Sequence, residues 1–184
     1  GGPSRPFFKA PGTGPMNKTI LALSLTLFLH TADAKVFEVS NQSFLAKVFD
    51  NQPLKPKVIW LDQEKRYVME SILQHRAPYI RVKYWQKGAK TVWILNEIGK
   101  EKPITVGVVI EQSKIKQLSV LAFRESRGWE VKHDFFTRQF NDATINDELQ
   151  LNQTIDGISG ATLSVRALTK IAKIALYLER HTQP

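Results

Sequence analysis

The sequence predicts an α+β fold: an antiparallel sheet of about four or more strands packed against a C-terminal helix, with an accessory helical layer at the N-terminus. Three observations support this class. Apolar residues alternate with polar ones, at a period of two, between residues 79 and 123. The breaks in this alternation are short, which suits antiparallel neighbours. Near residue 162 the apolar period becomes that of an amphipathic helix.

Four strands are expected in the alternating region. Ile104, Val106 and Val108 share one face of the third strand, and Leu118 and Val120 share one face of the fourth. One face of the sheet should therefore pack against the C-terminal helix. The expected strands cover residues 79–85, 91–98, 104–110 and 115–123.

Residues 35–78 are expected to form the N-terminal accessory helical segment. A short helix is predicted at 43–49, with Ser40 or Asn41 near its cap, and Pro53 follows it. A brief extended run at 58–61 precedes Asp62, which suits the N-cap of a second helix reaching residue 74.

The C-terminal part should contain a short helix at 133–140 and a long amphipathic helix after residue 162. Phe135, Phe136 and Phe140 are expected in the core, since large aromatic side chains contribute most through buried area. On the long helix the predicted polar face carries Arg166, Lys170, Lys173, Tyr177 and Arg180, and the predicted apolar face carries Ser164, Leu168, Ile171, Ala175 and Leu178.

The first 34 residues resemble sequence that is removed from the mature protein. Residues 1–15 are rich in glycine and proline, and we interpret them as a tag or a misplaced start ahead of Met16. Residues 16–34 have the form of a signal peptide, with an apolar run at 19–29 and the small-residue site Ala32-Asp33-Ala34. An uncleaved anchor is the alternative, but the apolar run is short for a membrane span. We therefore expect an exported periplasmic or extracytoplasmic protein, with membrane association as a secondary expectation.

The composition narrows the function classes. The formal net charge is +9, but the basic residues are scattered and export argues against nucleic acid, so a solvated basic surface is expected. The chain has no cysteine, which excludes disulfides, iron–sulfur clusters and c-type haem attachment. The four histidines have no metal-ligand spacing, and no nucleophile–base set can be argued from their order. The sequence therefore predicts neither catalytic residues nor a metal site.

Residues 156–164, Asp-Gly-Ile-Ser-Gly-Ala-Thr-Leu-Ser, lie directly before and at the start of the long helix. Gly157 and Gly160 permit a positive φ and a close backbone approach, and a helix N-terminus offers free N–H groups that suit a phosphate. The alternative interpretation is that Asp156, Ser159 or Thr162 simply caps the helix.

The run from Asp156 to Thr162 resembles the D-x-x-[ST]-G-A-T motif of the FMN-binding domain family. This family includes flavin-carrying components of the sodium-translocating NADH:quinone oxidoreductase and of the Rnf complex. The resemblance implies an FMN-binding domain over residues 79–184, with FMN held covalently on Thr162 through a phosphoester bond. The cofactor-binding residues expected from this motif and the helix start after it are Asp156, Ser159, Gly160, Ala161, Thr162, Leu163, Ser164 and Arg166.

A second motif follows the fourth expected strand. Glu125, Ser126 and Gly128 are similar to the Glu-[Thr/Ser]-x-Gly element that helps to form the flavin pocket of the family. Trp129 comes next and offers an indole that can stack on a flat ring, as does Trp93, although a tryptophan in a strand is usually a core residue. Arg166 is expected either to pair with the phosphate or to lie on a solvated face.

The resemblance implies an electron carrier more than a stand-alone enzyme, because the reactivity belongs to the flavin. It also implies two partners: an FAD-dependent FMN transferase that attaches the cofactor, and a membrane-bound redox partner. Two alternatives stay open. The domain could bind a flavin or another phosphorylated ligand reversibly, in a sensing or interaction role, or it could be a purely structural domain.

Overall fold

A computed structural model describes residues 1–2 and 36–182. The expected signal peptide lies outside the described residues. In the described part of the chain, no helix combines the length and apolar character that a membrane crossing needs.

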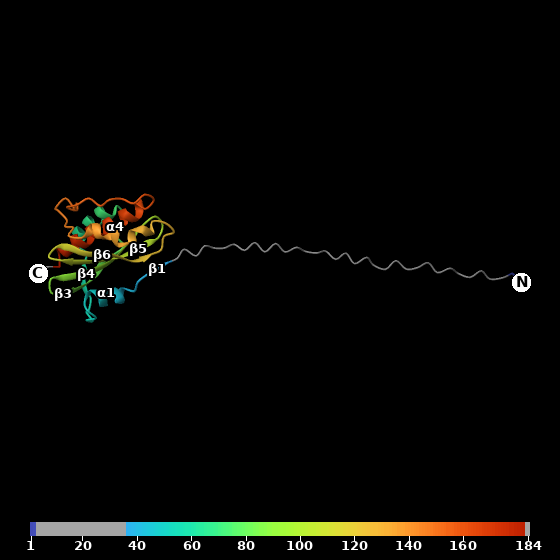
Figure 1. The fold of residues 1–184 in the computed structure, drawn as a ribbon, viewed down its shortest axis with the longest axis horizontal. Coiled ribbons are helices and arrows are strands. Elements are labelled where there is room, and N and C mark those ends of the chain that lie inside the picture. Colours follow the sequence, from blue (N-terminus) through green and yellow to red (C-terminus); the bar gives the residue numbers. More distant parts are fainter. Residues whose placement is uncertain (3–35, 183–184) are drawn as a thin grey trace. The chain divides into compact units, whose positions relative to one another are not determined.

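The molecule is built on a six-stranded antiparallel sheet with the strand order β1-β6-β5-β4-β3-β2 (Figure 1). The α+β class is confirmed, and so are all four strands predicted from the alternating pattern. The two edge strands come from the N-terminal segment, since β1 pairs with β6 and β2 pairs with β3. The strands are β1 (Phe37–Glu38), β2 (Lys57–Trp60), β3 (Arg81–Lys87), β4 (Lys90–Ile98), β5 (Pro103–Glu111) and β6 (Lys114–Phe123).

The helices cover both faces of the sheet. The eight-residue α1 lies on one face, whereas α2 and α4 lie on the other (Figure 1). Both N-terminal helices begin where the sequence predicts, because the side chains of Ser40 and Asp62 accept hydrogen bonds from the first turns. The helices are α1 (Asn41–Val48), α2 (Gln63–Leu73), α3 (Asp134–Thr137) and α4 (Thr162–Glu179), with 3-10 turns η1 (Trp129–Lys132) and η2 (Arg138–Phe140).

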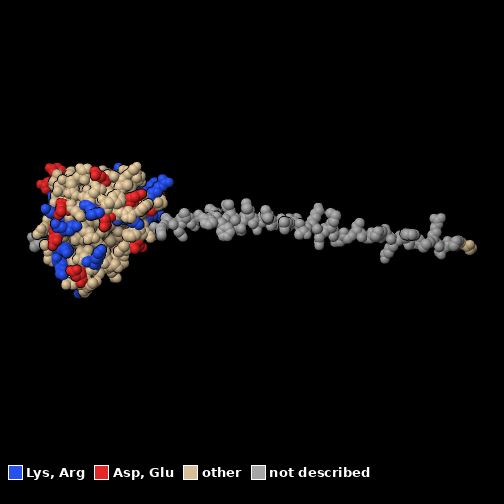
Figure 2. Space-filling view, in the orientation of Figure 1, with Lys and Arg blue, Asp and Glu red and all other residues tan. Residues whose placement is uncertain are grey.

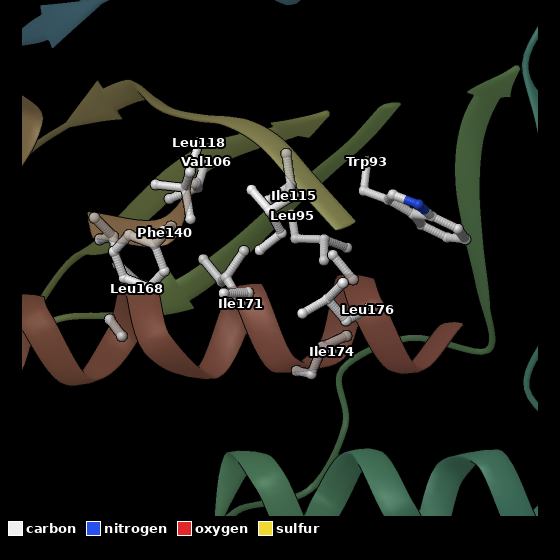
Figure 3. Packing of buried hydrophobic residues seen from close by; sticks show 14 of the residues in the cluster. Trp93, Leu95, Val106, Ile115, Leu118, Phe140, Leu168, Ile171, Ile174 and Leu176 are labelled. Carbon is white, nitrogen blue, oxygen red and sulfur yellow. The ribbon is translucent and has the colours of Figure 1, made fainter. Parts of the chain in front are cut away.

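The main core lies between the sheet and α4. Figure 3 shows Leu168 and Ile171 of α4 among side chains from the central strands, and Phe140 of η2 joins the same cluster. A smaller cluster around Phe44 and Val109 fills the opposite face, under α1. Because both faces are covered, β5 is buried along nearly its whole length. The expected packing of the C-terminal helix on one sheet face is confirmed.

The polar face predicted for α4 is partly wrong. Tyr177 is buried instead of exposed, because α2 covers this side of the helix. Lys170 is also partly covered, and its ammonium donates to the carbonyl of Leu73 at 2.5 Å and contacts the Glu97 carboxylate at 3.3 Å. The helix is therefore sandwiched between the sheet and α2, and only part of its polar side reaches solvent.

Candidate functional site

The site begins where α4 begins. The first helical residue is Thr162, and the N-cap position is occupied by Ala161, which has no side chain that can accept a hydrogen bond. The interpretation that Asp156, Ser159 or Thr162 caps this helix is therefore wrong. Capping side chains normally satisfy the free N–H groups of a helix start. Here, within the described residues, no side chain does so.

Thr162 presents its hydroxyl at this uncapped end. The residue is exposed, as is Leu163 next to it, whereas Ser164 is buried. The first helical hydrogen bond is donated by Val165 to the Ala161 carbonyl, so the N–H groups of the three residues before it have no partner in the helix. The positive end of the helix dipole lies at the same place, and this combination suits a phosphate bonded to Thr162.

The loop before α4 is held by its backbone. Gly160 has a φ of +80°, which fits the expected left-handed conformation, whereas Gly157 does not have a positive φ. The N–H of Ala161 donates to the Ile158 carbonyl at 2.9 Å. Asp156 and Ser159 are both exposed. A turn of this kind brings the chain around immediately before Thr162 and leaves the threonine hydroxyl accessible.

Gln139 fixes the beginning of the motif, although sequence reasoning did not select it. Its side-chain oxygen accepts a hydrogen bond from the Asp156 N–H at 2.7 Å, and its amide nitrogen donates to the Asp156 carbonyl at 3.4 Å. This pair of contacts ties the loop to η2. A glutamine in a short 3-10 turn carries no pattern of its own, so only the tertiary structure identifies it.

The two motifs meet at Gly128. A Cβ added to this glycine would lie 2.8 Å from the Ser164 Oγ and 3.4 Å from the Ala161 Cβ. Gly128 also has a φ of +83°, a conformation that side chains disfavour. The residue is therefore glycine for two reasons: its backbone conformation and the close approach of the α4 N-terminus. The structure thus brings the two expected motifs together at this point.

The Glu125 carboxylate binds the turn between β4 and β5. One oxygen accepts hydrogen bonds from the backbone N–H groups of Lys100, Glu101 and Lys102, at 2.6, 2.7 and 2.9 Å. Burial alone would raise the pKa of this carboxyl, but the three N–H donors outweigh burial and lower the pKa. Glu125 therefore anchors the β4–β5 turn to the loop that carries Gly128, while Ser126 is exposed.

An aromatic cluster adjoins Gly128. The Trp129 ring is half exposed and contacts the His133 ring edge-on, with 5.0 Å between the centroids. The Lys132 ammonium lies 5.6 Å from the Trp129 ring centroid and 4.6 Å from that of Phe37. An exposed indole beside the helix start is available to a flat ligand.

Of the other aromatic residues considered, three are buried in the core and one is exposed. Trp93 is fully buried and stacks on Tyr84, with 4.8 Å between ring centroids, so it is a core residue. Phe136 and Phe140 are buried in the core as expected. The expectation for Phe135 is wrong: its ring is 60% exposed and lies beside His133.

Arg166 lies on the solvent side of α4, one turn after Thr162. It is exposed, and the described residues offer it neither an ion pair nor a hydrogen bond. Its side chain lines a groove together with Lys170 and Lys173. Elsewhere basic and acidic side chains are interspersed, as Figure 2 shows for one face.

Fold and site together define a small α+β domain in which the uncapped N-terminus of α4 has free N–H groups that suit a phosphorylated ligand. Residues 99–177 match the model of the FMN-binding domain family. This match is consistent with an FMN-binding domain in this part of the chain and supports a flavin-binding protein. The match covers β5, β6, both motifs and α4 as far as residue 177, whereas β1, β2, β3 and β4 complete the sheet from outside it. A search of curated proteins gave no match to the chain.

The residues present fit the phosphate of FMN. The start of α4 is uncapped, and the N–H groups that follow the exposed Thr162 are free to donate to a phosphate. No carboxylate accepts hydrogen bonds from these N–H groups within the described residues. When bound, FMN supplies one- and two-electron chemistry through its ring. The chain itself would bind the phosphate and offer the Trp129 ring to the flavin, and the close approach of Gly128 to Ser164 holds the two loops together.

Proposed function

We propose that the protein carries FMN covalently on Thr162 and passes electrons between a membrane-bound redox partner and a second acceptor. The observation that carries this proposal is the uncapped start of α4, where an exposed threonine is the first helical residue. A helix N-terminus without a capping side chain is costly to leave free and favourable for a phosphate.

Attachment would need a separate FAD-dependent FMN transferase, because an unactivated threonine hydroxyl is a weak nucleophile. In the step, a bond forms between the Thr162 oxygen and the phosphorus of the FMN half of FAD. The pyrophosphate bond of FAD breaks, AMP leaves, and the hydroxyl proton is lost to a base of the transferase. Thr162 and Asp156 are exposed, so an enzyme can reach the motif.

The bound phosphate would keep one negative charge and accept hydrogen bonds from the N–H groups of Leu163 and Ser164. Arg166, four residues after Thr162 and free of ion pairs in the described structure, is a further candidate for the same charge. Trp129 would flank the flavin ring from the adjoining loop. A covalent link suits an exported protein, since free flavin would diffuse away; export itself is proposed from the sequence of residues 16–34.

The test is co-expression of the chain with an FMN transferase, followed by denaturing electrophoresis. A fluorescent flavin band is expected for the unmutated protein, and it should disappear in Thr162→Ala. Ser159→Ala is the matched control, because it removes an exposed hydroxyl from the same loop and should keep the band. If flavin is bound in solution but lost on denaturation from the unmutated protein, the domain binds flavin reversibly and the covalent proposal fails.

A further inference from the structure

A groove beside the flavin site lies between α2, α4 and the loop at residues 148–150. Its volume is about 660 Å³, within the range of small-molecule sites. A second hollow of about 420 Å³ adjoins it and shares Gln150, Thr169 and Lys173 with it. The groove is lined by Ser71, Ile72, Gln74, Glu148, Leu149, Gln150, Arg166, Thr169, Lys170 and Lys173.

Three cationic side chains on one face of α4 line this groove, but only one of them, Lys170, pairs with a carboxylate. Lys170 lies against the buried Glu97 carboxylate, with 3.3 Å between Nζ and Oε1. Lys173 contacts no carboxylate in the described structure, and its ammonium donates to the neutral side-chain oxygen of Gln150 at 2.9 Å. Arg166 is exposed and forms no ion pair within the described residues. The groove therefore carries two unmatched positive charges.

The partly buried position of Lys173 makes an unpaired ammonium group energetically unfavourable there. Its side chain is half-buried, and burial lowers the pKa of its ammonium. An ammonium has three donors, and only one of them is used here. A partly buried charge is normally paired. The one carboxylate among the lining residues belongs to Glu148, which is exposed and pairs with neither cation.

We propose that this groove is a reversible binding site for a small polyanion that bears phosphate or carboxylate groups, with Lys173 and Arg166 as its charged ligands. The partly buried Ile72 and Leu149 supply an apolar wall beside the charges. Ser71 and Thr169 offer no donor to an anion, because their hydroxyl groups donate to the carbonyls of Val68 and Val165, so binding depends on the cations. Arg166 lies at the end of the groove nearest Thr162 in the sequence and could be shared with the FMN phosphate, whereas Lys173 belongs to the groove alone, so the test below is made without flavin.

Isothermal titration of the full chain with inorganic pyrophosphate, at low ionic strength and without flavin, tests the proposal. Gln150→Glu is the sharpest variant, because it keeps the side-chain shape and places a carboxylate against the Lys173 ammonium. Both Gln150→Glu and Lys173→Gln are expected to weaken binding about tenfold or more, as expected for loss of a charge-assisted contact. Lys87→Gln removes an exposed cation from the end of β3 and should leave binding unchanged.

Two results would overturn the inference. One is no binding of pyrophosphate by the unmutated protein. The other is an equal loss of affinity in all three variants, which would indicate a non-specific response to net charge. Circular dichroism of each variant separates loss of the site from loss of the fold. Because no flavin is present in the titration, its outcome is distinct from that of the test of covalent attachment.

Discussion

Gly128 and Ser164 lie so close together that a Cβ at position 128 would be 2.8 Å from the serine Oγ. The two residues are 36 positions apart in the sequence and belong to different motifs. Their contact holds the loop after β6 against the start of α4. It is therefore the physical link between the surface that carries Trp129 and the residue that we propose as the attachment point.

Gly128→Ala should be the most disruptive of three matched glycine substitutions. We expect it to lower the free energy of unfolding by about 2 kcal/mol, since it combines a positive φ with a steric overlap. Gly160→Ala meets no neighbour but keeps a φ of +80°, so a loss of about 1 kcal/mol is expected. Gly157→Ala has open space and no positive φ, and should cost little. Urea denaturation measures all three, and equal effects would contradict the packing at Gly128.

Glu125→Gln should lower the free energy of unfolding at neutral pH, and the loss should be smaller in acid. The pKa of Glu125 is lowered in the folded state, from a usual value of 4.5. Its contribution is therefore fully present above about pH 4.5 and is lost as the pH falls through the lowered folded value. The measurement is the difference in unfolding free energy between Glu125→Gln and the unmutated protein at several pH values. A difference that grows in acid would show that the three N–H contacts are wrong.

The loss of stability caused by His75→Gln should be larger at low pH than at high pH. His75 Nε2 lies 3.0 Å from both oxygens of Glu97, which also faces Lys170. Its pKa is raised above the usual 6.5, first by the Arg76 carbonyl at Nδ1 and then, against burial and the Lys170 charge, by Glu97. The stabilising contact is therefore complete below 6.5 and is lost as the pH rises through the raised value. Thermal unfolding should show a larger loss in Tm for His75→Gln at low pH than at high pH, and the reverse order would refute this arrangement.

Trp129→Ala should change the flavin and leave the fold intact. The ring is half exposed, so its removal should alter the free energy of unfolding by less than about 1 kcal/mol. If the flavin ring lies against the indole, flavin fluorescence should rise, since an adjacent indole quenches it by electron transfer. Tyr67→Ala, at an exposed aromatic residue of α2, is the control. Unchanged flavin fluorescence in Trp129→Ala would remove this residue from the site.

The local patterns of the sequence predicted most of the fold. The strands from β3 to β6 and the caps at Ser40 and Asp62 follow from alternation and capping chemistry, which depend only on neighbours in the chain. The edge strand β1 has only two residues, too few for any periodicity. Tyr177 falls at a polar position of the helical pattern, and only the packing of α2 against α4 buries it.

The site was predictable in its motifs but not in its contacts. Residue types identified both the stretch around Thr162 and the one around Gly128. The pattern could not show that Ala161 holds the cap position, that Gln139 ties down Asp156, or that Glu125 bonds the turn at residues 100–102. Each of these depends on residues brought together by the sheet from distant parts of the chain.

Covalent attachment of FMN to Thr162 can be measured by mass spectrometry of proteolytic peptides from protein co-expressed with an FMN transferase. We predict that the peptide containing Thr162 gains the mass of FMN less one water. Fragmentation should place this mass on Thr162 and not on Ser159 or Ser164. A peptide of unmodified mass, from a preparation in which the transferase is shown to modify a known acceptor, would contradict the proposed attachment.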